Sequence, residues 1–218
     1  MGILATVVLV CSLGILGLRQ WVLEGFEVPT TSMLPTFRPG DRVWVNKMRY
    51  MGSAVPQRGD IVVFPQPGTG TLYVKRVVGL PGERVTVLGR QVFIGDQPAE
   101  NIQVARDDPE VALWADQWPQ GARLGWATMP DSGARYRVLL APLSLASWRL
   151  SGTWRIPEGH VFVVGDARDD SSDSRSWGPV PIKDLVGQVR CRVDAGNRSS
   201  HPMPSRSGCS PDDPLILP

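Results

Sequence analysis

The sequence predicts a mostly β protein: an antiparallel β-sheet domain with a β insertion, preceded by one N-terminal transmembrane helix. Three observations predict it. An uncharged apolar stretch occupies residues 2–18 and has no counterpart later in the chain. Short Val-rich segments separated by turn residues follow it. The 218 residues include 23 Gly and 20 Pro, and both residue types break helix interiors, which argues against a helical bundle.

The composition limits the class of protein further. Hydrophobic residues make up 42% of the chain, which is enough for a sizeable core and excludes a wholly disordered chain. The length suits one elaborated domain or a domain with appendages. The formal net charge is only +2, and no block of Lys and Arg concentrates it, so we expect no nucleic-acid partner.

The apolar stretch is best interpreted as an uncleaved membrane anchor over residues 1–23. Seventeen helical residues span about 25 Å, slightly less than the hydrocarbon core of a bilayer, and Trp21 and Arg19 suit the interface. A cleaved signal peptide would need a basic start and a small-residue cleavage site, and a buried core helix would need periodic polar positions. Arg19 on the C-terminal side of the stretch would by itself favour a cytoplasmic body.

The region after the anchor reads as short strands bounded by Gly, Pro or Asp. The expected strands are 42–46, 60–64, 72–78, 84–88, 91–94, 135–140, 160–164 and 186–193. Residues 99–134 are acidic and weakly periodic, so we expect an insertion there. The Ser- and Pro-rich segment 194–218 is expected to be a flexible tail.

Few residues of the chain suit metal binding or a histidine-based triad. The only histidines are His160, which opens a predicted strand, and His201 in the tail, so a Ser-His-Asp triad and a zinc site are both disfavoured. Cys191 and Cys209 could form a disulfide in an oxidising compartment. We expect no metal and no cofactor.

A serine can instead be activated by a lysine that is kept neutral by burial. Of Lys47, Lys75 and Lys183, only Lys75 lies inside an apolar strand, where alternation places it on one face with Tyr73 and Val77. Such a lysine could also be an ordinary strand residue that extends to solvent.

Residues 28–36 offer the serine. Pro29 and Pro35 bracket a run that cannot be helical throughout, and this loop can expose Ser32. The backbone amide of Ser32 and the hydroxyl of Thr30 could then form an oxyanion hole. A plain polar loop explains the same residues equally well.

A third segment, 165–178, holds four Asp, two Arg and four Ser. It reads as an acidic surface loop or as a loop fixed by a buried pair between Asp173 and Arg175. It lacks the terminal Glu of a helix-loop-helix calcium site, which disfavours calcium.

Taken in order, these segments resemble type I signal peptidases, the membrane-bound Ser-Lys leader peptidases of bacteria. The resemblance covers nearly all of 1–190. It follows the anchor through PTTSMLPT (29–36), GDRVWV (40–45), RGDIVVF (58–64), KRVVGLPGE (75–83) and GDARDDSSDSRSWGPV (165–180).

The resemblance implies a role for each matching residue. Ser32 is the implied nucleophile and Lys75 the implied general base, with Thr30 and the Ser32 amide holding the oxyanion. Ser171 would orient the Lys75 amine, Asp173 with Arg175 would brace the loop, and Gly165 would allow close approach. The residues that would line shallow pockets for small substrate side chains are Phe26, Val28, Pro29, Met33, Tyr73 and Val74.

The resemblance also implies the arrangement around the membrane. The peptidase domain would span 24–193, with 90–155 as a variable inserted region, and would lie on the extracytoplasmic side of the cell membrane, against the Arg19 signal. Its partners would be the lipid bilayer and signal-peptide-bearing preproteins. Thr31, Ala167 and Asp170 depart from the family's usual residues without removing a proposed catalytic atom.

Three alternatives remain. The chain could be a specialised Ser-Lys peptidase of conjugal transfer or pilin processing, or an inactive membrane-tethered β module that binds exported peptides. Cytoplasmic self-cleaving repressors share the Ser-Lys pair, but the anchor and the lack of a DNA-binding segment disfavour them.

Overall fold

The computed structural model describes residues 22–52, 54–104, 120–129, 131, 133–142 and 150–193. The expected anchor over 1–23 lies outside these residues except for its end, where Leu23 already begins a strand. The tail over 194–218 also lies outside them. Within the described part of the chain, no helix has both the length and the apolar character needed to cross a bilayer.

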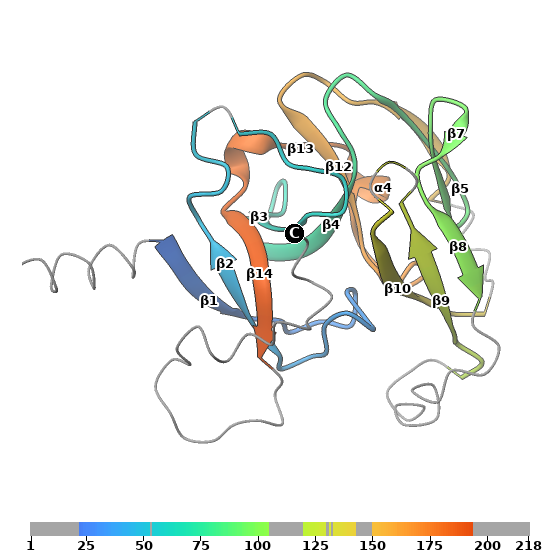
Figure 1. Ribbon diagram of the computed structural model, residues 1–218, viewed down its shortest axis with the longest axis horizontal. Helices are drawn as coiled ribbons and strands as arrows, with labels where there is room; N and C mark the ends of the chain where they lie inside the picture. The colour runs from blue at the N-terminus through green and yellow to red at the C-terminus, as the bar shows by residue number, and fades with distance from the viewer. Residues whose placement is uncertain are drawn as a thin grey trace, which may run out of the picture.

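The described residues form three antiparallel sheets and two short helical segments (Figure 1). The elements in chain order are β1 (Leu23–Glu27), β2 (Arg42–Asn46), β3 (Ile61–Pro65), β4 (Leu72–Gly79), β5 (Arg84–Leu88), β6 (Gln91–Ile94), β7 (Gln97–Pro98), β8 (Asn101–Val104), β9 (Arg123–Thr128), β10 (Arg135–Leu140), β11 (Gly152–Arg155), β12 (His160–Val164), α4 (Ser174–Trp177), β13 (Val180–Pro181), η1 (Ile182–Asp184) and β14 (Gly187–Val193).

The largest sheet has seven strands in the order β1-β2-β14-β3-β4-β12-β13. All its pairings are antiparallel, and β4 lies between β3 and β12, with Val62 opposite Lys75. The central strands are rich in Val and buried on both faces, which is the composition that favours β structure. Lys75 is therefore fixed near the middle of the molecule.

The remaining strands form two smaller sheets, ordered β11-β5-β6-β7 and β10-β9-β8 (Figure 1). Both contain strands of the region 90–155 that the sequence assigns to an inserted β region. Apolar side chains of β5, including Val85 and Val87, pack with Val78 of β4 and Phe162 of β12. This shared core joins the four-stranded sheet to the large one.

The eight strands predicted from the sequence are confirmed, each within one residue at either end. The sequence missed β1, β7, β8, β9, β11 and β13. In β1 and β8 most side chains are exposed and alternation is weak, so pairing with β2 and β9 defines them as strands. Two of the missed strands, β8 and β9, fall inside the weakly periodic segment 99–134, where the sequence predicts an insertion.

Cys191 is buried in β14 and is disulfide-bonded. Cys209, which the sequence offers as its partner, lies outside the described residues.

Gly79, the last residue of β4, lies where the large sheet packs closely against the four-stranded sheet. A Cβ at this position would lie 2.6 Å from Cγ2 of Val85 and 2.8 Å from Cβ of Phe162. Overpacking of this kind costs about 1–3 kcal/mol. Gly79→Ala should therefore lower the free energy of unfolding by that amount, measured by urea denaturation of the full chain in nonionic detergent.

Gly25→Ala is the matched control, because a Cβ at Gly25 would meet only Trp44, at an ordinary 3.5 Å. We expect it to change the free energy of unfolding by less than about 0.5 kcal/mol. Equal losses in the two variants would contradict the packing described for Gly79.

Candidate active site

A short loop between β1 and β2 carries the serine. Its two ends are tied together, since the Val28 amide donates to the Asp41 carbonyl and the Gly40 amide to the Val28 carbonyl, each at 2.8 Å. Inside the loop, the amide of Phe37 donates to the carbonyl of Met33 at 2.9 Å, and both side chains are fully buried. The buried side chains anchor the loop, so Ser32 beside Met33 has a defined position.

Ser32 and Lys75 meet although 43 residues separate them in the sequence. The Lys75 amine Nζ lies 2.5 Å from Ser32 Oγ, within hydrogen-bonding distance. The hydroxyl of Thr30 lies 3.1 Å from the same Ser32 oxygen. Ser32 is 9% exposed and Lys75 only 1% exposed, so the pair lies almost entirely out of water. The structure thus brings together the three side chains that the sequence selected as the reacting centre.

Burial determines the protonation of Lys75. Loss of hydration lowers the pKa of Lys75 to about 8, against the opposing effect of the negative charges of Asp173 and Asp166, while the positive charge of Arg175 lowers it further. The ring of Tyr73 lies 5.1 Å from the amine and covers it from one side. A substantial fraction of Lys75 is therefore neutral at mildly alkaline pH and can accept a proton.

Asp173 and Arg175 form the buried pair that the sequence suggested. Arg175 donates from Nε to Oδ1 and from Nη2 to Oδ2 of Asp173, both at 2.8 Å. Asp173 caps α4 and also accepts the Gly165 amide at 2.9 Å. Burial alone would raise the pKa of Asp173, but the hydrogen bonds and charge of Arg175 hold it below the ordinary value, so Asp173 stays ionised.

Gly165 is the point where the two loops touch. A Cβ at this position would collide with the side chain of Ser171 and with the carbonyl oxygen of Ser32. Two hydrogen bonds fix the same contact, from the Ala167 amide to the Ser32 carbonyl at 3.1 Å and from the Thr31 hydroxyl to Asp170 at 3.0 Å. Only glycine permits this close approach. Thr31, Ala167 and Asp170, the three positions that differ from the usual residues of the family that the sequence resembles, all take part in the contact.

Ser171 lies at this contact, but its hydroxyl is not hydrogen-bonded to Lys75. The Ser171 Oγ is buried, and its hydroxyl interacts with the Asp173 carboxylate and helps to lower the pKa of that group. The orienting role that the resemblance implies for Ser171 is therefore not seen as a direct hydrogen bond to Lys75.

Sequence reasoning missed a second set of buried charges, which lies on the face of β4 opposite Lys75. These charges join the loop that carries Ser32 to the loop that follows β12; we call them the brace. Arg76 donates to both carboxylate oxygens of Asp166, at 2.8 and 2.7 Å, and Thr36 donates to Asp166 at 2.5 Å. Strand alternation places Arg76 opposite to Lys75. The adjacent Lys-Arg pair in a buried strand was the only signal of this brace in the sequence.

The brace continues into the inserted sheets. The fully buried Arg168 is hydrogen-bonded to both carboxylate oxygens of Glu100, and Tyr136 of β10 is hydrogen-bonded to the same carboxylate. The carbonyl of Arg168 accepts a hydrogen bond from Arg175 at 2.7 Å. Glu100 thus connects the inserted region to the loop beneath Lys75.

The apolar residues selected for substrate contact differ in their exposure. Val28 and Met33 are fully buried in one core cluster, against which the half-buried Phe26 and Val74 pack. Tyr73 is half-buried on the Lys75 face and packs edge-on against Trp177, with the ring centres 5.5 Å apart. Pro29 is exposed. The accessible apolar surface thus comes from Phe26, Pro29, Tyr73 and Val74.

In the described residues, no group of three or more His, Cys, Asp and Glu side chains is placed to hold a metal ion. His160 is removed from the reacting centre and lies against its own turn, with Nδ1 3.0 Å from the carbonyl of Glu158. The chemistry that this arrangement can support is proton transfer from Ser32 to Lys75.

Breaking the buried pair should be costly. Arg175→Met leaves the ionised Asp173 without its partner, and loss of one member of a buried pair typically costs about 3–5 kcal/mol. Arg84→Met is the matched control, because Arg84 is 60% exposed and lies 3.4 Å from Asp96, so its loss should cost less than about 1 kcal/mol. Denaturant unfolding of both variants at pH 7 compares them; similar costs would rule out the bracing role.

Comparisons with known proteins identify the family of this chain. The family "Signal peptidase, peptidase S26" matches residues 2–193. A signal peptidase I of Pseudomonas fluorescens is 35% identical over 80% of this chain and 63% of its own length, and one of Pseudomonas aeruginosa is 36% identical over 84% and 65%. One of Leptolyngbya laminosa is 32% identical over 84% of this chain and 74% of its own length.

This chain therefore spans just under two thirds of the length of the two Pseudomonas relatives. A crystal structure of a signal peptidase I from Enterococcus faecalis V583 is 28% identical and covers 61% of this chain and 95% of that chain, with a TM-score of 0.35. On the match of residues 2–193 and the identity to these relatives, the chain belongs to the signal peptidase family, peptidase S26.

Proposed function

We propose that this protein is a membrane-bound serine endopeptidase that removes N-terminal signal peptides from exported preproteins with a Ser-Lys dyad. The observation that carries the proposal is the 2.5 Å contact between Ser32 Oγ and Lys75 Nζ at a site almost without water. A hydroxyl paired with an amine of lowered pKa is an activated nucleophile. Membership of the signal peptidase family supports signal-peptide-bearing preproteins as the class of substrate.

In the first half of the reaction, neutral Lys75 removes the proton of Ser32 as Oγ attacks the carbonyl carbon of the scissile peptide bond. The resulting ammonium then donates that proton to the leaving amine, and the carbon–nitrogen bond breaks. The signal peptide is left as an ester on Ser32. A water molecule attacks this ester with Lys75 again as the base, which releases the signal peptide and restores the serine.

The negative oxygen that forms during each attack needs hydrogen-bond donors. We assign these to the Ser32 amide and the Thr30 hydroxyl, which lies 3.1 Å from Ser32 Oγ and can turn toward a bound carbonyl. We assign to Ser171, whose buried side chain lies beside Gly165 and interacts with Asp173, the role of orienting the Lys75 amine. We assign to Asp173, Arg175 and Gly165 the role of holding the loop after β12 against the loop that carries Ser32.

We infer substrate selection from the apolar residues beside Ser32 and Lys75. Phe26 and Val74 pack against one face of the large sheet, with Val28 and Met33 buried behind them, and Tyr73 lies on the Lys75 side. Pro29 stiffens the rim. A shallow apolar surface supported by a fully buried layer accepts small side chains and excludes large ones by steric overlap. This predicts small residues before the cleaved bond.

The membrane part of the proposal rests on residues 2–18. Ser32 follows this apolar stretch by only 14 positions, so an anchor there would hold the site close to the bilayer surface, where a signal peptide leaves the membrane. The family resemblance favours the extracytoplasmic side for the peptidase domain.

Removal of either member of the dyad should abolish cleavage. Ser32→Ala and Lys75→Ala should each lower the rate of preprotein cleavage by at least about 10⁴-fold, because neither variant can form the acyl-enzyme efficiently. The assay uses the full chain in nonionic detergent with a general secretory preprotein. Ser172→Ala and Lys183→Ala, at exposed positions, are the matched controls and should cleave at the normal rate.

Normal processing by Ser32→Ala or Lys75→Ala would exclude the dyad. Binding of the preprotein without turnover by the unaltered chain would identify an inactive binding module instead. Selective cleavage of a pilin or conjugal-transfer precursor, with no action on a general preprotein, would identify a specialised peptidase.

The pH dependence should report Lys75 directly. Because the reactive form is the neutral amine and its pKa is lowered to about 8, kcat/KM should fall about tenfold per pH unit below pH 8 and level off above it. Stopped assays between pH 5.5 and 9.5 measure the profile. A flat rate from pH 6 to pH 9 would be inconsistent with a lysine base.

A further inference from the structure

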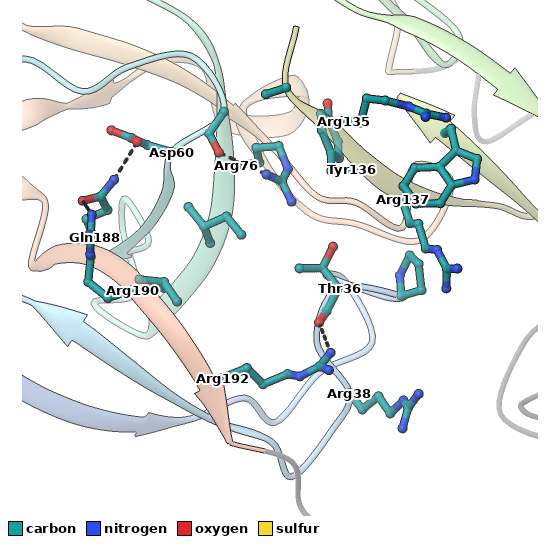
Figure 2. A pocket seen from close by; sticks show the side chains of 16 residues that line it. Thr36, Arg38, Asp60, Arg76, Arg135, Tyr136, Arg137, Gln188, Arg190 and Arg192 are labelled. Atoms are coloured by element: carbon teal, nitrogen blue, oxygen red, sulfur yellow. Dashed lines mark hydrogen bonds between the residues drawn. The ribbon is translucent and has the colours of Figure 1, made fainter. Parts of the chain in front are cut away.

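A cavity of about 350 Å³ lies between β14 of the large sheet and β9 and β10 of the inserted region, and the proposed mechanism does not use it. Pro35, Thr36 and Arg38, from the loop that carries Ser32, complete its wall. Figure 2 shows Gln188, Arg190 and Arg192 on one side, Arg135 and Arg137 on the other, and Thr36 and Arg38 between them. We call this space the arginine cleft.

The arginine cleft is strongly basic. Six arginines line it: Arg38, Arg76, Arg135, Arg137, Arg190 and Arg192. The single carboxylate among its described lining residues is Asp60, which accepts hydrogen bonds from the Tyr50 hydroxyl at 2.8 Å and from the Gln188 amide at 2.7 Å. Arg76 is paired with Asp166, which lies outside the lining.

Several of these arginines are held in place by the protein. The guanidinium groups of Arg135 and Arg137 lie 4.8 and 5.0 Å from the ring centre of Trp126, and Arg192 donates to the Thr36 carbonyl at 2.8 Å. Arg190 donates to the Gln188 side chain at 3.2 Å. A guanidinium has five N–H donors, so one that holds a ring or a carbonyl in this way can still donate to a ligand.

Such a wall matches a phosphate group in chemistry. The planar fork of Arg presents paired N–H donors at the spacing of phosphate oxygens, and several such forks around one space favour a ligand with concentrated negative charge. Trp126 adds an apolar surface beside the charges. A ligand with a phosphate and an adjoining nonpolar or uncharged part would use both features.

The strand register places the arginine cleft near the start of the described chain. Leu23 of β1 lies opposite Asn46 of β2, and Asn46 lies opposite Gln188 of β14. Two strand spacings separate Leu23 from Gln188, or about 10 Å. If residues 2–18 cross the bilayer, as the proposed function holds, the end of the arginine cleft near Arg190 lies at the depth of the lipid headgroups.

We propose that the arginine cleft binds the phosphate of an anionic phospholipid headgroup. This inference rests on the membrane-bound part of the proposed function, which supplies the ligand, but it concerns a site separate from the Ser32–Lys75 centre. Because the wall includes Thr36 and Arg38, a bound headgroup would contact the same loop that carries Ser32.

The test is a calorimetric titration of the full chain in uncharged detergent with short-chain phosphatidylglycerol and, separately, with inorganic phosphate. Arg135→Gln/Arg190→Gln removes two exposed arginines of the cleft. Arg84→Gln/Arg155→Gln removes the same charge from facing exposed positions in β5 and β11, away from the cleft, and measures general uptake of lipid by the micelle.

We expect phosphatidylglycerol to bind the unaltered chain and the Arg84/Arg155 variant alike, with at least tenfold weaker binding to the Arg135/Arg190 variant. Equal binding by all three proteins would overturn the site. Inorganic phosphate that binds as tightly as the lipid would overturn the headgroup as the ligand. Cleavage of a preprotein is measured on the same samples. If the unaltered chain binds the lipid but does not cleave the preprotein, the result counts against the proposed function and not against this site.

Discussion

The removal of water from one amine is the constraint on which the rest of this structure depends. Lys75 lies in the middle of a seven-stranded sheet, between two strands that are buried on both faces, and only 1% of its surface is exposed. Burial of a lysine is unfavourable for the charged form, and this cost is what lowers its pKa to about 8. The β core therefore positions the base of the proposed mechanism, and the short loop after β1 brings Ser32 to it.

Two carboxylates close to the site, Asp173 and Asp166, both raise the pKa of Lys75. If they acted alone, they would favour the charged form of the amine. Each is held by its own buried arginine, Arg175 in one case and Arg76 in the other. Desolvation is the largest effect on the pKa of Lys75, and the positive charge of Arg175 adds to it against the two carboxylates. The same ion pairs fix the two loops that meet at Ser32, so electrostatic tuning and positioning of the site come from the same residues.

The sequence predicted the parts of this structure that depend on local pattern. The eight predicted Val-rich strands agree with the structure within one residue at either end, and the lysine that the sequence selected in an apolar strand is buried and contacts Ser32. Strands such as β9, with Gly and Ala in its interior, form because of their partners and left no periodic signal. The link from Glu100 to Arg168 joins residues 68 positions apart and depends on three-dimensional packing, so neither residue stood out in the sequence.

The most direct test of the neutral-lysine account is a titration of the Lys75 side chain itself. The chain contains three lysines, so selective ¹³C labelling of lysine Cε followed by NMR between pH 6 and pH 11 can resolve each one, with Lys75→Met assigning the signal. The account predicts a midpoint near pH 8 for Lys75. A midpoint at or above about pH 10, the ordinary value for lysine, would contradict it.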